Sequence, residues 1–418
     1  MKRKFRLVTL LGIRPDIIRM RKLLHLLDRG QAGNGYQHLY VHSGQHYDDS
    51  LDGIFHRELG VRRPKFNMGM GKTLKKRGKT SHVYQAALLF EKTAQMVERI
   101  RPDAVLFLGD TNTVLSSIVV AKYGVPVIHI EGGGRSFDWR MPEEKNRIII
   151  DHLSDAIYCY LERYKQILLA EGVAKHRVVA VGNVIVDALE EFLPDARQRP
   201  ILRRLGVQPR KYALCTLHRE ENIENRQMFA AKVEGLSELS RLLPVVFPVM
   251  PRVRARLRSY GLANLLKGPG IIVTEPLGFL DFLKLEAEAK MIVTDSGTVQ
   301  EEALLLGVPC LVTRRSTERP ETIAAGASIL AEGNLFPNAQ RVLQMAPHWD
   351  RTVLNPLGGS PSERIYEDLL NRIRSGYFAE SRSLPMLQGN RFAREAYGLA
   401  QCSLKHLSPL CDKALCAR

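Results

Sequence analysis

Short apolar runs alternate with longer amphipathic stretches along most of this chain, and this alternation constrains its fold more than any other feature. In the first half, the apolar runs predict β-strands at residues 6–11, 38–42, 104–108, 125–130, 156–159 and 178–181. A helix is predicted from Pro15 to Arg29, because proline suits a first helical position and Gly30 suits the end. Strands that alternate with helices are typical of a parallel sheet covered on both faces.

The same pattern starts again in the second half of the chain. Apolar runs predict strands at residues 212–217, 245–249, 271–273, 291–294 and 310–312. Residues 193–209 carry three prolines and many charges, and we interpret them as a linker. A single core rarely grows beyond about 250–300 residues, so the 418 residues predict two α/β domains with a boundary near Asp187. A helix is expected at 362–372, and a loosely structured tail after Gly376.

The composition narrows the class of protein. The formal net charge of +17 is compatible with a polyanion, a membrane surface or a phosphorylated substrate as partner. Aromatic residues do not interleave with the basic ones and no nucleic-acid-binding module occurs, so we expect no nucleic-acid partner. No apolar stretch approaches the roughly 20 residues that span a bilayer, and the run Leu7–Gly12 is too short for a signal peptide. We therefore expect no membrane association and a cytoplasmic location.

Polar residues suited to chemistry follow the predicted strands. Arg14, Asp110 and Glu131 follow strands of the first domain, and His218 and Asp295 follow strands of the second. Ligands of such sheets bind beyond the carboxyl ends of the strands, and the cleft between two domains is the natural place for a site. Each residue alone could cap a helix or occupy a turn. Their common position favours a site in the cleft.

The turn Ser296-Gly297-Thr298 opens a predicted helix that ends near Leu306. Backbone N–H groups at such a helix end attract anions, which suits a diphosphate. A simple serine cap would have the same sequence. Neither GxGxxG nor GxxxxGK[ST] occurs, so the fingerprints of NAD enzymes and P-loop NTPases are absent.

Segments spread in order over about residues 7–365 closely resemble the non-hydrolysing UDP-N-acetylglucosamine 2-epimerases. The first half contributes Gly12-Ile13-Arg14-Pro15-Asp16, Ser43-Gly44-Gln45-His46, Gly109-Asp110-Thr111-Asn112-Thr113, His129-Ile130-Glu131-Gly132-Gly133 and Pro142-Glu143-Glu144-Lys145-Asn146-Arg147. The second half contributes His218-Arg219-Glu220-Glu221-Asn222, Asp295-Ser296-Gly297 with Gln300-Glu301-Glu302, and Thr317-Glu318-Arg319-Pro320-Glu321. A collinear set this long is highly specific. The segment Phe137-Asp138-Trp139-Arg140-Met141 resembles most closely the members from surface-polysaccharide pathways.

The resemblance implies an α/β fold of two Rossmann-like domains that face a cleft, the GT-B architecture. It implies a first domain at 1–186 with the catalytic carboxylates and a UDP-binding domain at 187–345. A closing helix within 346–375 would pack back on the first domain, followed by a tail of unknown role at 376–418. We expect a UDP-sugar as partner, no metal, no redox cofactor and a homodimer.

The resemblance also assigns roles to residues. Asp110, Glu131 and Glu143 would supply the catalytic carboxylates, and His218 would join them as a catalytic residue near the diphosphate. Eight residues would bind the substrate, with Glu302 on the ribose hydroxyls and the arginines around the diphosphate: Arg14, Arg19, Ser296, Gly297, Thr298, Glu302, Arg319 and Phe279.

Members of this family invert C2 of UDP-N-acetylglucosamine by eliminating UDP and adding it back with the proton on the opposite face. Because the C2 proton is poorly acidic, this route needs carboxylates near C2 and cations around the departing diphosphate. Gly132 and Gly134 stand where alanine and leucine are usual in the family, which predicts a looser loop after Glu131.

Three alternatives stay open at this level. The substrate could be a modified UDP-sugar, such as a 2,3-diacetamido uronic acid or a 6-deoxy sugar. A GT-B glycosyltransferase would share the architecture, although the set Asp110, Glu131 and Glu143 argues against it. A catalytically silent sugar-nucleotide-binding protein would be compatible with the altered loop after Glu131.

Overall fold

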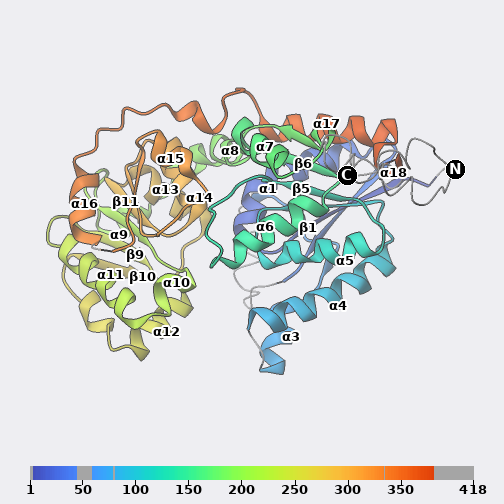
Figure 1. Ribbon diagram of the computed structural model, residues 1–418. Helices are drawn as coiled ribbons and strands as arrows, with labels where there is room; N and C mark the ends of the chain where they lie inside the picture. Colours follow the sequence, from blue (N-terminus) through green and yellow to red (C-terminus); the bar gives the residue numbers. More distant parts are fainter. Residues whose placement is uncertain (1–2, 45–58, 79–80, 334, 381–418) are drawn as a thin grey trace, which may run out of the picture.

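The computed structural model describes residues 3–44, 59–78, 81–333 and 335–380, which form two parallel sheets flanked by helices (Figure 1). The first sheet has the strand order β3-β2-β1-β4-β5-β6-β7, and the second has the order β10-β9-β8-β11-β12-β13. Each sheet runs outward from a central strand in both directions, as in a doubly wound Rossmann-like domain. The predicted α/β class with two such domains is confirmed.

The first domain contains the strands β1 (Phe5–Leu11), β2 (Tyr36–His42), β3 (Phe66–Asn67), β4 (Ala104–Leu108), β5 (Val127–Ile130), β6 (Ala156–Cys159) and β7 (Val178–Ala180). The α-helices of this half of the chain are α1 (Arg14–Gly30), α3 (Met70–Arg77), α4 (His82–Ile100), α5 (Ser116–Lys122), α6 (Pro142–Leu153), α7 (Glu162–Ala170) and α8 (Ile185–Arg197). Two short 3₁₀ turns, η1 (Asn112–Leu115) and η2 (Lys175–Arg177), complete it.

The second sheet contains β8 (Ala213–Thr216), β9 (Val245–Pro248), β10 (Ile271–Thr274), β11 (Met291–Thr294), β12 (Cys310–Val312) and β13 (Ser328–Leu330). The helices of this half are α9 (Ile201–Leu205), α10 (Glu220–Ile223), α11 (Arg226–Leu239), α12 (Pro251–Ser259), α13 (Phe279–Glu288), α14 (Gly297–Leu306), α15 (Pro320–Ala324) and α16 (Leu335–Leu343). The chain ends, as far as it is described, in α17 (Pro361–Ser375) and α18 (Tyr377–Glu380), and η3 (Ala263–Leu266) and η4 (Arg351–Leu354) are 3₁₀ turns.

The predicted strands agree with the observed ones, apart from one or two residues at some ends. β3 and β13 were not predicted, since two or three residues give too little pattern to read. The interpretation of residues 193–209 as a linker is wrong: α8 continues through Pro194 to Arg197, and α9 follows. The buried side chains of Phe192 and Ala196 bind this part of α8 to the core, so tertiary packing overrides the proline.

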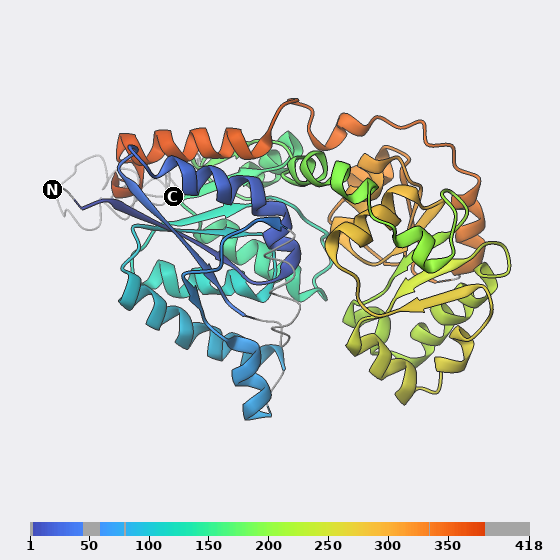
Figure 2. The same cartoon turned by 180° about the vertical axis from the view of Figure 1, so that it is seen from behind.

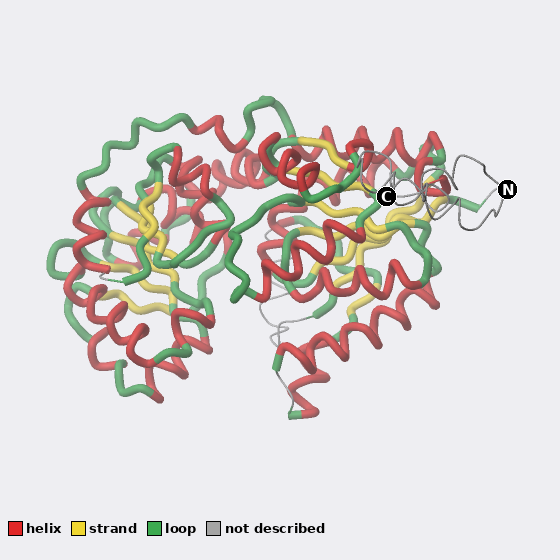
Figure 3. The backbone as a smooth tube through the Cα atoms, in the orientation of Figure 1, coloured by secondary structure: helices red, strands yellow, loops and turns green. Residues whose placement is uncertain are grey.

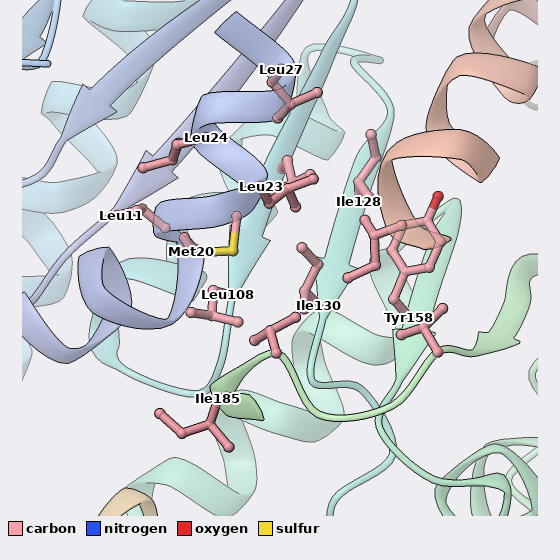
Figure 4. Close-up of a cluster of buried hydrophobic side chains, with 14 of the residues drawn as sticks. Leu11, Met20, Leu23, Leu24, Leu27, Leu108, Ile128, Ile130, Tyr158 and Ile185 are labelled. Carbon is pink, nitrogen blue, oxygen red and sulfur yellow. The ribbon is translucent and has the colours of Figure 1, made fainter. Parts of the chain in front are cut away.

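A buried apolar stripe on α1 fixes this helix against the first sheet (Figure 4). Met20, Leu23, Leu24 and Leu27 recur at the spacing of one helical face, and each is at most 2% exposed. They pack in one cluster with strand residues that include Leu108, Ile128, Ile130 and Tyr158. Because α1 is held along its length, the polar residues of its first two turns have a fixed position beside the carboxyl ends of β4 and β5.

Helix α17 returns from the second half of the chain and packs along α1 and α8, as Figure 2 shows from behind. Asp368 accepts a hydrogen bond from the Tyr158 hydroxyl at 2.7 Å, and the backbone N–H of Ser362 donates to Asp187 at 2.8 Å. The helix predicted at 362–372 is therefore present. No helix in the described part of the chain is long and apolar enough to cross a membrane.

The loosely structured tail was predicted to begin directly after Gly376, and this start is too early. Residues 377–380 form the short helix α18, in which Phe378 is only 2% exposed and its ring lies 5.9 Å from that of Phe5. The Tyr377 hydroxyl donates to the backbone carbonyl of Asp155 at 2.8 Å. Residues 381–418 lie outside the described structure.

This packing predicts different results for two changes near the end of the chain. We expect Phe378→Ala to lower the free energy of unfolding by about 3 kcal/mol, because a buried aromatic ring is lost. Removal of residues 381–418 should leave turnover unchanged, since no recognised motif lies there. Urea unfolding and a turnover assay check both. A shortened chain that unfolds normally but has lost turnover would show that the tail contributes to the site.

Candidate active site

Four buried side chains from both domains meet at the junction, and we call them the arginine–carboxylate cluster: Arg19, Glu131, Glu301 and Arg319. Glu131 directly follows β5, and both Arg19 of α1 and Arg319 before α15 pair with its carboxylate. The Nε atom of Arg319 lies 2.5 Å from Oε1 of Glu301 on α14. One carboxylate from each domain, Glu131 and Glu301, thus pairs with the guanidinium of Arg319.

The cluster sets the charge of Glu131. Burial by itself would raise the pKa of this carboxyl, but the charges of Arg19 and Arg319 outweigh it and lower the pKa to about 2. For Glu301 the effect of burial prevails over the charge of Arg319 and raises the pKa to about 8. The amide of Asn183 donates to Glu301 at 2.7 Å. The pairing therefore favours the ionised form of Glu131, whereas burial makes ionisation of Glu301 less favourable.

The backbone at Glu131 is strained. Its φ angle is +78°, in the left-handed region that costs a non-glycine residue about 1–3 kcal/mol and that is common at active sites. The next two glycines are required by close packing: a Cβ atom on Gly132 would lie 2.1 Å from Ile157, and one on Gly133 would lie 2.3 Å from the carbonyl oxygen of Tyr164. A Cβ atom on Gly134 would find its nearest neighbour, Nη1 of Arg319, at an ordinary 3.6 Å, so the looser loop expected from Gly132 and Gly134 stays a prediction.

A second charged group lies beside this cluster. Asp110 follows β4 and pairs with Arg147 of α6, and Nη2 of Arg147 lies 3.7 Å from Oε2 of Glu318 in the second domain. Glu318 also contacts Arg314 at 2.7 Å and Arg219 at 3.5 Å. Despite its burial, these charges lower the pKa of Glu318 well below the usual range. The pairing places Asp110 near the domain junction in a cationic environment.

Glu143 lies in the first turn of α6 and is half-buried. Its charge and that of Asp110 both act on Arg219, and they help to raise the pKa of this guanidinium against the effect of burial. The long loop between β5 and α6 runs along the junction (Figure 3), where Ser316 of the second domain donates to Asp138 at 3.1 Å. The three predicted carboxylates therefore belong to one region.

Helix α14 opens at the same junction. The Oγ atom of Ser296 accepts the backbone N–H of Val299 at 3.4 Å, so its side chain serves as a helix cap, as in the simpler interpretation of this motif. A Cβ atom on Gly297 would lie 2.4 Å from Oε1 of Glu318, so only glycine allows this approach. Thr298 is half-buried.

His218 follows β8 and is held by Asp295. Its backbone N–H donates to the Asp295 carboxylate at 3.0 and 3.1 Å, and its ring Nδ1 lies 3.3 Å from Oδ1. Burial would raise the pKa of Asp295, but His218 and hydrogen bonds from Asn222 and the backbone lower it. The side chain of His218 is half-exposed.

Three further residues, Phe279, Glu302 and Arg14, are predicted to bind the substrate. Phe279 packs edge-on against Phe192, with ring centroids 5.3 Å apart, and is 5% exposed in the core. Glu302 is buried and faces the carboxyl of Glu286. Arg14 begins α1 and is half-buried. Their contacts with a substrate stay predictions.

Sequence reasoning missed several charged residues that organise the site: Arg147, Arg219, Glu301, Arg314 and Glu318. Four of them stand inside the motifs that carry the resemblance, and their place in these motifs was the signal that could have identified them. Arg314 lies outside them, and only its complete burial beside Glu318 reveals its role. Gln45 and His46, which belong to one of the motifs, lie outside the described residues.

Fold and site together define a two-domain α/β protein with a buried arginine–carboxylate cluster where the domains meet. A family model for UDP-N-acetylglucosamine 2-epimerase matches residues 29–369. The chain therefore belongs to the UDP-N-acetylglucosamine 2-epimerase family.

Individual relatives agree with this assignment. A Methanocaldococcus jannaschii protein named UDP-N-acetylglucosamine 2-epimerase is 38% identical over 371 residues, which cover 86% of this chain and 97% of that protein. A Pseudomonas aeruginosa protein named UDP-2,3-diacetamido-2,3-dideoxy-D-glucuronate 2-epimerase is 32% identical and covers 87% of this chain and 99% of its own length. The crystal structure of the M. jannaschii UDP-GlcNAc 2-epimerase in complex with UDP-GlcNAc and UDP superposes with a TM-score of 0.80, at 35% identity, covering 88% of this chain and 100% of that one.

Proposed function

We propose that this protein is an isomerase that converts UDP-N-acetylglucosamine to UDP-N-acetylmannosamine by anti-elimination of UDP and its re-addition. The observation that carries the proposal is the buried contact of Glu131 with Arg19 and Arg319, which come from different domains. Two guanidinium groups form a strong site for a diphosphate, and the carboxylate between them is a base next to the leaving group.

In this proposal the substrate changes the state of Glu131. A general base works best when its pKa lies near the working pH, and a carboxylate with a pKa of about 2 is a weak base. A bound diphosphate would compete with Glu131 for Arg19 and Arg319. Glu131 would then lose part of its cationic stabilisation, and its pKa would rise. Substrate binding would thereby make Glu131 a better acceptor for the C2 proton.

Epimerisation needs proton transfer on both faces of C2, so one base is not enough. Asp110 and Glu143 are the proposed partners, with Arg147 fixing the orientation of Asp110. Arg14, Arg19, His218 and Arg319 would surround the diphosphate and stabilise its charge as the C1–O bond breaks. Ser296, Gly297 and Thr298 would hold the nucleotide at the start of α14, with Glu302 on the ribose hydroxyls. Phe279 would complete the substrate site through its position at the start of α13.

The proposed organisation of the chain follows from the same argument. We place the first domain at 1–186, the UDP-binding domain at 187–345 and the returning helix within 346–375. The strands of the first sheet end at Ala180 and those of the second begin at Ala213, which supports a division between them. A homodimer in the cytoplasm is the expected assembly, and light scattering of the purified protein measures its mass.

Reaction in deuterated water tests the mechanism. If UDP leaves and returns, the product should carry solvent deuterium at C2, because the abstracted proton exchanges before the sugar is protonated again. A small amount of free UDP and 2-acetamidoglucal should also accumulate, since the intermediate is not covalently bound. NMR of the anomeric and C2 signals measures both.

Three results would contradict parts of the proposal. Epimerised product without deuterium at C2 would exclude elimination and re-addition. Conversion of a 2,3-diacetamido uronic acid derivative, with no conversion of UDP-N-acetylglucosamine, would keep the mechanism and change the substrate. Transfer of the sugar to an acceptor would indicate a glycosyltransferase.

A further inference from the structure

Two carboxyl groups face each other in the core of the second domain. Glu286 of α13 is completely buried, and among the described residues neither of its carboxyl oxygens has a hydrogen-bond donor. The carboxyl of Glu302 on α14 lies within hydrogen-bond distance of it and is 5% exposed. Two ionised carboxylates this close would repel each other strongly. The pair must therefore share a proton, which also satisfies the hydrogen bonding of Glu286.

Among the described residues, one cation acts on this pair. Tyr212 before β8 and Cys310 on β12 are close enough to feel the charge of Glu286, and both are neutral groups. Arg19 of α1 is the cation that acts on Glu302. Burial raises the pKa of both carboxyls, and for Glu302 it prevails over the hydrogen bond with Glu286 and the charge of Arg19, with a resulting pKa of about 7.

The other acidic groups of α13 are paired elsewhere. Asp281 contacts Arg199 at 2.7 Å, and Glu288 contacts Lys284 at 3.3 Å. No charged side chain of α8, which packs against both helices, acts on the pair within the described part of the structure. Within the described structure, Glu302 is thus the acidic group that faces Glu286.

We propose that Glu286 is a positioning residue that donates a shared proton to Glu302 and so keeps the Glu302 carboxylate oriented to accept the ribose hydroxyls of a uridine nucleotide. The inference rests on the proposed function, because it assumes that Glu302 binds the ribose. It extends that function by assigning a role to a residue one layer behind the site. In this arrangement Glu302 would lie between the nucleotide and Glu286, and Glu286 would act through Glu302 without touching the nucleotide.

The shared proton predicts how binding depends on pH. With one proton in the pair, Glu286 donates and the ionised Glu302 accepts from the ribose. When the pH falls below the pKa of Glu302, a second proton neutralises Glu302 and the ribose loses a charged acceptor. Affinity for the nucleotide should therefore decrease as the pH falls through this range. Without a donor at position 286, Glu302 would be a lone buried acid, its pKa would rise further, and the decrease would occur at higher pH.

The experiment compares two ligands and four proteins by calorimetry between about pH 6 and pH 9, a range that brackets the raised pKa values of buried acids. The ligands are UDP and 2′,3′-dideoxyuridine diphosphate, which lacks both ribose hydroxyls. The proteins are the wild type, Glu286→Leu, Glu286→Gln and the matched control Glu288→Gln. Glutamine still donates a hydrogen bond to Glu302, whereas leucine does not.

We expect Glu286→Leu to bind UDP about 10-fold more weakly at neutral pH, the effect of one hydrogen bond to a charged group. Its pH profile should move to higher pH, while its affinity for the dideoxy ligand should be unchanged. Glu286→Gln and Glu288→Gln should bind UDP like the wild type. Thermal unfolding of Glu286→Leu should remain cooperative and close to that of the wild type, because a buried acid has been replaced by an apolar side chain of similar size.

Two outcomes would overturn the positioning role itself. If Glu286→Leu keeps the affinity and the pH profile of the wild type, Glu286 only fills space. If it weakens both ligands equally, Glu286 acts through the general fold. If the wild type binds both ligands equally, Glu302 does not contact the ribose. If the wild type does not bind UDP, the proposed function is wrong.

Discussion

Glu131→Gln should reduce turnover by about 10²–10⁴-fold, because glutamine cannot take the C2 proton. Its affinity for UDP should be equal to or higher than that of the wild type. In the structure Glu131 occupies Arg19 and Arg319, and a diphosphate would have to compete with it. A neutral amide competes less strongly for the two guanidinium groups. Higher affinity with lost turnover is a combination that misfolding cannot produce.

The measurement uses initial rates by NMR and UDP affinity by calorimetry. Glu171→Gln is a matched control, since Glu171 also pairs with a buried arginine, Arg135, but outside the cluster. The control should keep both rate and affinity. If Glu131→Gln lost affinity in proportion to its loss of rate, Glu131 would contribute to binding and would not be the base. Asp110→Asn and Glu143→Gln should also lose turnover, by about 10²-fold or more, with UDP binding largely preserved.

Arg319→Ala should weaken the binding of UDP by about 10²–10³-fold, the usual effect of removing one partner of a buried charge pair. It should also lower the rate, because the same guanidinium would stabilise the departing diphosphate. Arg319 contacts both Glu131 and Glu301, so its removal leaves two buried acids with less positive charge beside them. The pKa of Glu131 should then rise.

Two further variants separate charge from geometry at this position. Arg319→Lys keeps the charge but lacks the planar group that reaches two carboxylates, so we expect an intermediate affinity. Arg315 stands four residues before Arg319, is exposed and pairs with Glu332, so the control variant Arg315→Ala should bind UDP normally. Unchanged UDP affinity in Arg319→Ala would exclude a contact between Arg319 and the diphosphate.

Local patterns in the sequence were enough for the architecture. Strands such as 104–108 and 291–294 were predicted with their observed limits, because buried parallel strands are short continuous apolar runs between turns. The same patterns placed Asp110 and Glu131 at strand ends, and parallel strands bring such ends to one edge of a sheet. These features depend on neighbours in the chain, so the sequence by itself determined them. The collinear motifs then identified the family.

The pairings inside the site depend on contacts between distant segments, and only the tertiary structure decided them. Glu131 and Arg319 are 188 residues apart, and no periodicity relates them. Glu286 and Glu302 look like ordinary helical glutamates until α13 and α14 pack and bring the two carboxyls together in the core. Likewise, Pro194 ends a helix in a local interpretation, but the burial of Phe192 and Ala196 holds α8 together. Burial and charge neutralisation are properties of the packed molecule, so these contacts could not be predicted from residue order alone.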